Sequence, residues 1–360
     1  MSLHDPLIRK LMTRQDLTRA ESADLMADLM RTDAEGWRFL AFSVASQTKG
    51  ETAEELLGMY DGMLRLTGTY DIALPARSMD VSSTGGSGVR KINVSTLTAL
   101  VTGDLEVAVV KHSFFRVTSV TGSADALQAV GLPAPAATLP MIERALREVG
   151  VAFYSPIFVS RELGNLVHFG LLLAEKQVRV STPFHLIAPL FTPLKLTHRM
   201  FGINHPGQFD LIVDVFRGLG YQGAFAVRGL DGLDEVSIAA PTRIKGFKGR
   251  EDIDFVLEPE EVGLKRAPQS AVQPADAHES LGDFLRIACG KETGPKRDLV
   301  ALNSGVVFFL TDRAPSIEAG IELAIRRLES REVEAKLRTL VEQMGLPEVL
   351  EAARREYLSP

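Results

Sequence analysis

The chain has 360 residues, of which 45% are hydrophobic and 24% are charged, and its formal net charge is -6. This balance predicts a globular protein of one large or two ordinary domains. The negative charge gives no electrostatic reason to bind nucleic acid or an anionic membrane. The single cysteine, Cys289, excludes an internal disulfide and suits a reducing compartment. No segment resembles a signal peptide or reaches membrane-spanning length, so we expect a cytoplasmic protein with no membrane partner.

Residues 5–75 are expected to be helical. Thr18 and Thr52 each precede a glutamate by three residues, Glu21 and Glu55, which is the capping-box pattern that marks the start of a helix. Apolar residues recur at helical spacing after both threonines. These stripes favour a core or an interface between packed helices.

The pattern changes near residue 80, where short apolar runs begin to alternate with helical periodicity. Such alternation is typical of an α/β sheet whose strands are largely parallel. We expect strands at 107–110, 151–159, 224–227, 237–240 and 253–257. We expect helices at 123–130, 141–149, 161–176, 209–219, 281–288, 298–310 and 316–344.

A glycine-rich stretch at residues 80–96 is the strongest local signal for a ligand. It carries three glycines, two cations and a polar run at the start of a helical pattern, namely Gly85, Gly86, Gly88, Arg90, Lys91 and Asn93-Val94-Ser95-Thr96. Glycines permit a tight turn whose N–H groups converge, and a helix start adds further N–H groups and a positive dipole end. The spacing is neither that of a P-loop nor that of a dinucleotide turn. The stretch predicts a phosphate-binding loop or, alternatively, a plain surface turn.

Two further clusters lie where strands are expected to end. Residues 111–125 offer cations, hydroxyls and a helix start, and the loop at 229–235 ends with Asp234 and Glu235. Paired carboxylates beside phosphate oxygens suit Mg²⁺. Taken singly, Lys111 is equally consistent with a solvated strand end, His112 with a packed histidine, and the carboxylates with a helix or strand cap.

Together these motifs resemble the anthranilate phosphoribosyltransferase family, within the wider group that holds the pyrimidine nucleoside phosphorylases. The resemblance covers nearly the whole chain and rests on Lys49-Gly50-Glu51-Thr52, the glycine loop, Asn93-Val94-Ser95-Thr96, Lys111-His112, Gly122-Ser123-Ala124-Asp125, Ala188-Pro189-Leu190, Asp231-Gly232-Leu233-Asp234-Glu235 and Gly294-Pro295-Lys296-Arg297-Asp298. It implies an α/β fold class, with a small all-helical domain and a large α/β domain whose sheet is mostly parallel. The helical domain would comprise 1–75 with a contribution from about 160–190, and the α/β domain 76–159 and 191–360. It further implies a homodimer formed through the helical domain.

The resemblance also implies a donor site for phosphoribosyl pyrophosphate (PRPP). The donor would contact Thr84, Gly85, Gly86, Ser87, Gly88, Asn93, Ser95, Thr96, Lys111, Ser119 and Ser123. Ser95 would ligate one Mg²⁺ on the pyrophosphate, and Asp234 with Glu235 would hold a second. Phe114 and His185 would line the acceptor pocket. No residue is assigned as an acid or base, because the chemistry rests on positioning and charge stabilisation.

The sequence departs from the family pattern on both sides of this site. Ser83 replaces the first glycine of the loop and Ser87 replaces its aspartate, while Phe114 stands where an asparagine meets anthranilate. The anthranilate-binding arginine is matched most nearly by Glu175, and a phenylalanine-asparagine pair is replaced by Phe184-His185. A negative or apolar pocket would not favour the anthranilate carboxylate.

Three functions follow as hypotheses. The first is phosphoribosyl transfer from PRPP to an aromatic or nitrogenous acceptor, with anthranilate itself left open. The second is a catalytically silent paralogue that binds a ligand or, less favoured by the charge, nucleic acid. The third is a nucleoside phosphorylase, which would use orthophosphate in place of pyrophosphate.

Overall fold

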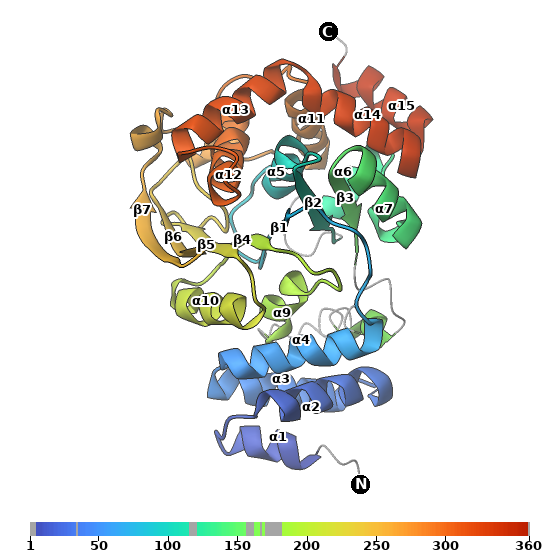
Figure 1. Cartoon of the computed structure of the whole chain (residues 1–360), viewed down its shortest axis with the longest axis vertical. Coiled ribbons are helices and arrows are strands. Elements are labelled where there is room, and N and C mark those ends of the chain that lie inside the picture. The colour runs from blue at the N-terminus through green and yellow to red at the C-terminus, as the bar shows by residue number, and fades with distance from the viewer. Residues whose placement is uncertain are drawn as a thin grey trace. The chain divides into compact units, whose positions relative to one another are not determined.

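The structure is a computed structural model that describes residues 5–33, 35–114, 121–155, 162–165, 168–169 and 182–358. The chain divides into two compact units, which Figure 1 shows with their elements labelled. The first unit comprises Met1–Asp71, Pro156–Lys195 and Asp210–Gly220. The second comprises Ile72–Ser155, Leu196–Phe209 and Tyr221–Pro360.

The first unit is helical. Its helices are α1 (Asp5–Met12), α2 (Arg19–Thr32), α3 (Trp37–Lys49), α4 (Ala53–Thr67), α9 (Phe184–Leu190) and α10 (Phe209–Gly218). Both predicted capping boxes are confirmed, with Thr18 and Thr52 as the N-caps of α2 and α4. A Cβ atom at Gly58 would stand 2.3 Å from the Arg19 carbonyl oxygen, so the glycine permits α2 and α4 to pack closely.

Aromatic side chains tie the mid-chain segment to the N-terminal helices of this unit. The Phe39 ring on α3 lies 4.4 Å from the Phe169 ring and 4.6 Å from the Phe184 ring, measured between centroids. The Tyr60 hydroxyl donates to the Thr192 carbonyl oxygen. Residues more than a hundred positions apart therefore share one core.

The second unit is built on a seven-stranded sheet in the order β3-β2-β1-β4-β5-β6-β7. The strands are β1 (Arg77–Ser83), β2 (Val107–His112), β3 (Val151–Tyr154), β4 (His198–Gly202), β5 (Gly223–Gly229), β6 (Thr242–Lys248) and β7 (Glu251–Leu257). The first five in sequence pair in parallel, and β6 and β7 add antiparallel ladders. The expected fold class, a small helical part with a large and mostly parallel α/β part, is confirmed.

The strand order reverses between β1 and β4. From β1 the chain adds β2 and β3 on one side, and then returns to place β4 on the other side. In open α/β sheets ligands bind at such a switch point, outside the carboxyl ends of the strands. The topology therefore predicts a ligand site at the residues that follow Ser83 and Gly202.

Helices accompany this sheet from α5 to the end of the described chain (Figure 1). They are α5 (Val94–Thr102), α6 (Ser123–Ala129), α7 (Leu139–Glu148), α11 (Ala277–Ala288), α12 (Pro295–Leu310), α13 (Ile317–Glu329), α14 (Glu332–Met344) and α15 (Pro347–Leu358). Single 3-10 turns occur at Ala134–Ala136, Pro206–Gln208, Pro259–Val262 and Gln269–Val272. In the part of the chain that the structure describes, no helix combines the length and apolarity needed to cross a membrane.

Three strands were not predicted, and one predicted strand does not form. β1 and β4 carry the buried charges Asp80 and Arg199, which interrupt the apolar runs that identify buried strands. The segment expected as a strand at 237–240 is a loop, and just before it the Val236 backbone exchanges hydrogen bonds with the Asn303 side chain instead of a neighbouring strand. β6, at Thr242–Lys248, follows directly and was missed.

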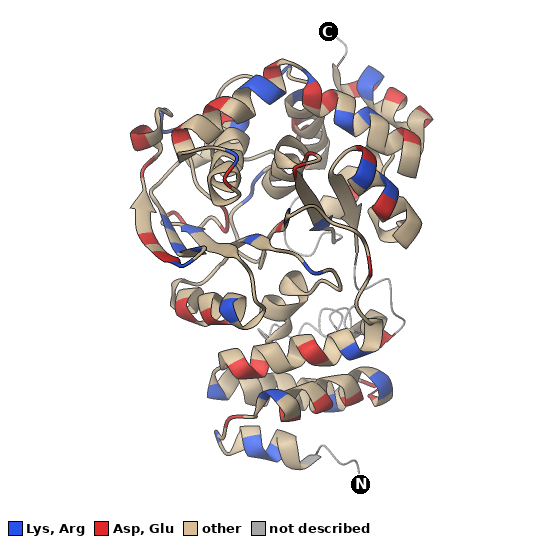
Figure 2. Cartoon of the chain, in the orientation of Figure 1, with Lys and Arg blue, Asp and Glu red and all other residues tan. Residues whose placement is uncertain are grey.

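The C-terminal helical region contains a break that the sequence pattern did not indicate. The single helix expected over 316–344 is divided into α13 and α14 at Arg331, whose φ of 63° lies in the left-handed region. Figure 2 shows acidic and basic residues mixed along these helices, without separation by sign. This mixing is in keeping with the modest net charge.

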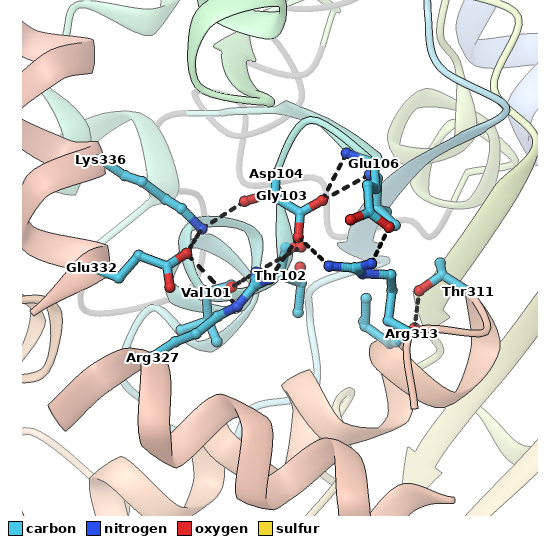
Figure 3. A network of polar contacts seen from close by, with 12 residues as sticks. Val101, Thr102, Gly103, Asp104, Glu106, Thr311, Arg313, Arg327, Glu332 and Lys336 are labelled. Carbon is cyan, nitrogen blue, oxygen red and sulfur yellow. Dashed lines mark hydrogen bonds and ion pairs between the residues drawn. The ribbon is translucent and has the colours of Figure 1, made fainter. Parts of the chain in front are cut away.

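A polar network at the amino end of β2 joins this strand to the C-terminal helices (Figure 3). Asp104 accepts hydrogen bonds from Arg327 at 2.6 Å, from Arg313 at 3.0 Å, and from the backbone N–H groups of Glu106 and Val107 at 2.9 Å each. Lys336 donates to the Gly103 carbonyl oxygen at 2.7 Å. The network lies at the edge of the sheet opposite to the carboxyl ends of the strands, so we interpret it as structural.

Candidate functional site

The glycine loop follows β1 at the switch point. The backbone N–H of Thr84 donates to the Gly202 carbonyl oxygen at 2.8 Å, which continues the pairing of β1 with β4. Gly85, Gly86 and Gly88 then adopt φ angles of 67°, 73° and 72°. Side chains rarely occupy this left-handed region, so the loop requires its three glycines.

Asn204, which follows β4, holds the loop in place. Its side-chain Nδ2 donates to the Gly85 carbonyl oxygen at 2.9 Å, and a Cβ atom at Gly86 would lie 3.2 Å from the same nitrogen. The Arg228 Nε in turn donates to the Asn204 carbonyl oxygen at 3.3 Å. Asn204 was missed from the sequence, and its position directly after a strand at the switch point is the signal that identifies it.

The helix α5 begins where the glycine loop ends. Asn93 is its N-cap residue, but its side chain is used elsewhere, because its Oδ1 accepts from the Thr121 hydroxyl at 3.0 Å. Ser95 and Thr96 lie in the first turn, where backbone N–H groups lack partners within the helix. Ser95 is half-buried, and the buried Thr96 hydroxyl has no hydrogen-bond partner among the described residues.

Lys111 and His112 end β2 and are both buried. The Lys111 ammonium donates to the His112 carbonyl oxygen at 3.3 Å, and burial lowers the pKa of this lysine. The His112 Nδ1 lies 2.6 Å from Asp80 Oδ2. Burial also lowers the pKa of His112 against the opposing effect of Asp80.

A buried ion pair beneath the loop was not predicted. Arg199 on β4 donates from Nη2 to Asp80 Oδ2 and to the Ser82 hydroxyl, both at 2.8 Å, and both charged side chains are fully buried. Neighbours in the sheet thus compensate each other's charge. Sequence reasoning treats isolated charges as exposed, and only the pairing of β1 with β4 shows that these two meet.

Asp234 and Glu235 lie together with Lys91. The Lys91 ammonium is 2.6 Å from Asp234 Oδ1 and 3.2 Å from Glu235 Oε1. The Ser83 and Ser87 hydroxyls also hydrogen-bond to Asp234, and the pKa of this carboxyl is low because Lys91 and these hydroxyls outweigh burial. The two serines that depart from the family pattern therefore both contact the predicted metal ligand.

The backbone of this acidic segment presses against the sheet. A Cβ atom at Gly202 would stand 1.9 Å from the Asp234 carbonyl oxygen and 2.8 Å from the Ser83 Cβ. Only a glycine at the end of β4 permits this approach. It places Asp234 directly beside the start of the glycine loop.

A divalent cation is a poor fit on the carboxylate pair while Lys91 is bound there. The oxygen donors are suitable, and Glu235 Oε2 is buried without a hydrogen-bond partner in the described part of the chain. The ammonium, however, already contacts one oxygen of each carboxylate. A second positive centre at the same oxygens would face strong repulsion in a buried site.

The structure describes three of the four remaining predicted site residues, namely Phe114, Ser123 and His185. The Ser123 hydroxyl accepts a hydrogen bond from the Phe114 N–H at 3.1 Å, and Phe114 packs edge-on against the His112 ring. His185 belongs to the first unit, where its Nδ1 accepts from the Thr182 N–H at 3.0 Å. Ser119 lies outside the described residues. The acceptor pocket therefore stays a prediction.

Family models match both parts of the chain. Residues 5–67 match the helical bundle domain of the glycosyl transferase family, and residues 76–332 match its a/b domain. The chain is 31% identical over 337 residues to an anthranilate phosphoribosyltransferase of Desulfosudis oleivorans, with 93% of this chain and 97% of the relative covered. It is 33% identical over 335 residues to that of Exiguobacterium sibiricum, with 93% and 96% covered.

Solved structures agree with these matches. The crystal structure of anthranilate phosphoribosyltransferase from Thermus thermophilus superposes with a TM-score of 0.83 at 29% identity, covering 94% of this chain and 98% of that one. The Saccharomyces cerevisiae enzyme in complex with PRPP and Mg has a TM-score of 0.83 at 20% identity, with 95% and 97% covered, which is a likeness of fold. The resemblance expected from the motifs is confirmed.

Proposed function

The chain belongs to the glycosyl transferase family, as do the anthranilate phosphoribosyltransferases that it resembles, and we propose that it transfers phosphoribose from PRPP to an aromatic or nitrogenous acceptor other than anthranilate. One observation carries the proposal. The glycine loop, the start of α5 and the Asp234–Glu235 pair gather at the switch point of a single α/β unit. This is where a sheet of this kind binds a phosphorylated ligand.

The reaction would proceed by positioning and charge stabilisation. The bond between C1 of the ribose and the pyrophosphate oxygen breaks, and the pyrophosphate leaves with the electron pair. A nitrogen of the acceptor forms the new bond to C1 and gives up its proton to the departing pyrophosphate or to water. Backbone N–H groups of the loop and of the first turn of α5 are suited to bind the leaving group, and Lys111 offsets its charge.

Magnesium enters this proposal as a companion of the pyrophosphate. When bound, Mg²⁺ neutralises part of the charge that develops on the leaving group. The Ser95 hydroxyl, in the first turn of α5, is the ligand that the chain would contribute. The assignment of Asp234 and Glu235 as a second set of ligands stays a prediction. A metal ion there would compete with the Lys91 ammonium for the same carboxylate oxygens.

The acceptor would differ from anthranilate because Phe114, one of its two predicted contacts, is apolar. The Phe114 ring is half-buried and packs on His112 with 5.2 Å between ring centroids. A phenylalanine offers no hydrogen bond to a carboxylate. We therefore propose an acceptor without a carboxylate at this point of contact, with His185 as the second predicted pocket residue.

We further propose a cytoplasmic homodimer formed through the helical unit. α1 and α3 border a groove of about 480 Å³ lined mainly by apolar side chains, among them Met12, Leu40 and Val44. Trp37 at the start of α3 is 69% exposed. Exposed aromatic and apolar residues gathered on one face are typical of a protein interface, and a second copy would cover them.

Binding of the donor is the decisive experiment. Titration calorimetry with PRPP and Mg²⁺ would compare the wild type with Lys111→Met, and Lys265→Met would serve as the control because Lys265 is exposed. Losing a hydrogen bond to a charged group costs about 1.5–3 kcal/mol, so Lys111→Met is expected to weaken binding by at least about tenfold. If the wild type binds no PRPP, the proposal is wrong.

Acceptor identity would be tested by release of pyrophosphate over a panel of aromatic and nitrogenous compounds that includes anthranilate. Turnover with a carboxylate-free acceptor and none with anthranilate supports the proposal. Phosphorolysis of nucleosides in its place would favour the nucleoside phosphorylase hypothesis.

A second function is favoured by two observations. Lys91 bridges the carboxylates expected to bind metal, and Ser87 stands where the family has an aspartate in the loop. A catalytically silent paralogue that retains a ligand would tolerate both changes. PRPP binding without turnover on any acceptor in the panel would support this second function.

A further inference from the structure

Lys91 reaches from the glycine loop into the acidic pocket. Its side chain is 15% exposed, and that of Asp234 is 1% exposed. The ammonium lies 2.6 Å and 3.2 Å from one oxygen of each carboxylate, an arrangement in which it bridges the pair. Arg90, its neighbour in sequence, is exposed. Of the two adjacent cations, only Lys91 is therefore held inside the site.

The charges around this bridge are balanced. Arg199 pairs with Asp80, and Lys91 pairs with the two acids of the loop. Lys111 interacts electrostatically with both Asp80 and Glu235. The six linked groups comprise three carboxylates and three cations, namely Asp80, Asp234, Glu235, Lys91, Lys111 and Arg199. Burial lowers the pKa of Lys111 and raises the pKa of Glu235, and these two changes offset each other in the sum. Counted either way, no net negative charge is left within this group to attract a divalent cation.

The ammonium also retains the capacity to bind an anion. It has three N–H donors, and the described residues use two of them, on Asp234 and Glu235. The third is available to a phosphate oxygen of a ligand in the glycine loop. The Ser83 and Ser87 hydroxyls support the same carboxylate, so the pocket is built around an ammonium rather than around an aspartate-rich metal site.

We propose that the Lys91 ammonium takes the place of a divalent cation on the Asp234–Glu235 pair and donates its remaining N–H to a phosphate of the ligand. This half of the site then binds a diphosphate without a metal ion. The inference rests on the proposed function for the identity of the diphosphate ligand, while the occupancy of the carboxylate pair is independent of it.

Uptake of Mn²⁺ by the protein alone tests the occupancy. Mn²⁺ stands in for Mg²⁺, and its free signal in electron paramagnetic resonance falls when it binds. We expect no uptake at this pair in the wild type or in the control Arg90→Met. Lys91→Met should gain one site, with an affinity at least about tenfold above that of any uptake by the wild type, and Lys91→Met with Asp234→Asn should lose it again.

Two results would overturn the inference. One is Mn²⁺ uptake by the wild type that Asp234→Asn abolishes. The other is folded Lys91→Met protein that gains no site, with folding checked by its thermal transition. If Lys91→Met does not fold, Lys91→Gln replaces it, because glutamine keeps the hydrogen-bond donor and removes the charge.

Binding of inorganic pyrophosphate in the presence of EDTA tests the second half of the inference. We expect the wild type to bind pyrophosphate under these conditions, and Lys91→Met to bind it at least about tenfold more weakly. Equal affinity would contradict the contact with phosphate. Neither measurement requires turnover, so the absence of transfer activity would remove the proposed function and leave this inference standing.

Discussion

The buried pair formed by Asp80 and Arg199 offers a sharp test of how the sheet supports the glycine loop. Asp80→Asn keeps the shape of the side chain and removes its charge, which leaves Arg199 fully buried without a counter-ion. Arg199→Met removes the other partner. The double variant removes both charges. It therefore separates the interaction energy of the pair from the cost of leaving one charge buried without its partner.

The expected magnitude follows from burial and from the pKa. Removing one partner of a buried pair costs about 3–5 kcal/mol of unfolding free energy. Burial alone raises the pKa of Asp80, but His112 and Arg199 outweigh it and bring the pKa to about 2, from 3.8. Because each pKa unit corresponds to about 1.4 kcal/mol, the charged form contributes about 2 kcal/mol to stability. A depressed carboxyl pKa stabilises above the unfolded value, and this stability is lost as the pH falls from 3.8 toward 2.

Urea unfolding followed by circular dichroism at pH 7 and at pH 3 would measure both effects. Asp254→Asn is the matched control, because Asp254 forms an exposed ion pair with Arg243 in the same sheet and such pairs contribute about 0–1 kcal/mol. Asp80→Asn should cost several times more at pH 7 and should lose less stability on acidification than the wild type. Equal losses of unfolding free energy in Asp80→Asn and Asp254→Asn would contradict the expected cost of a buried charge. So would a double variant, Asp80→Asn with Arg199→Met, whose loss equals the sum of the two single losses.

Three further predictions concern other parts of the chain. Asp104→Asn removes the counter-charge of the arginines in Figure 3 and should lower the unfolding free energy by about 1–3 kcal/mol in urea. Burial raises the pKa of Asp104, but hydrogen bonds from Arg327 and from the backbone outweigh it and lower the pKa. Asp104→Asn should therefore lose less stability below pH 4 than the wild type does. Gly202→Ala would force apart the end of β4 and the Asp234 carbonyl oxygen, so calorimetry should show weaker PRPP binding. Gly164→Ala should not, because no atom of the described residues lies within 4 Å of the added Cβ. Trp37→Glu should give a monomer in sedimentation velocity at concentrations where the wild type is a dimer, and an unchanged association state would count against the proposed interface.

Much of the fold could be predicted from local patterns. The capping boxes at Thr18 and Thr52 mark helix starts because a side-chain oxygen and a backbone N–H only a few residues apart satisfy each other. The alternation after residue 80 identified a parallel α/β sheet because apolar strands between amphipathic helices have few other ways to be buried. β1 and β4 were not predicted because each contains a charged residue that is buried, and a charged residue in a short segment is typical of an exposed one.

The candidate site was predictable only as far as residue type and motif spacing identify it. The glycine loop, Lys111 and the Asp234–Glu235 pair were recognised as residue types that suit a phosphate and a metal, and motif spacing placed them in one family. From the sequence, Lys91 is only one of two cations in the loop. Its contact with carboxylates more than a hundred residues away depends on the pairing of β1 with β4 and of β4 with β5, which no local pattern encodes.

The sequence by itself determined the fold class, the family resemblance and the set of residues able to bind a phosphorylated ligand. These properties depend on short-range periodicity, turn chemistry and residue type. Only the tertiary structure decided which charges neutralise one another, and it placed Lys91 on the predicted metal ligands and Arg199 on Asp80. The physical reason is that the strength of an ionic contact depends on distance and burial, and both arise only when strands distant in sequence become neighbours in one sheet.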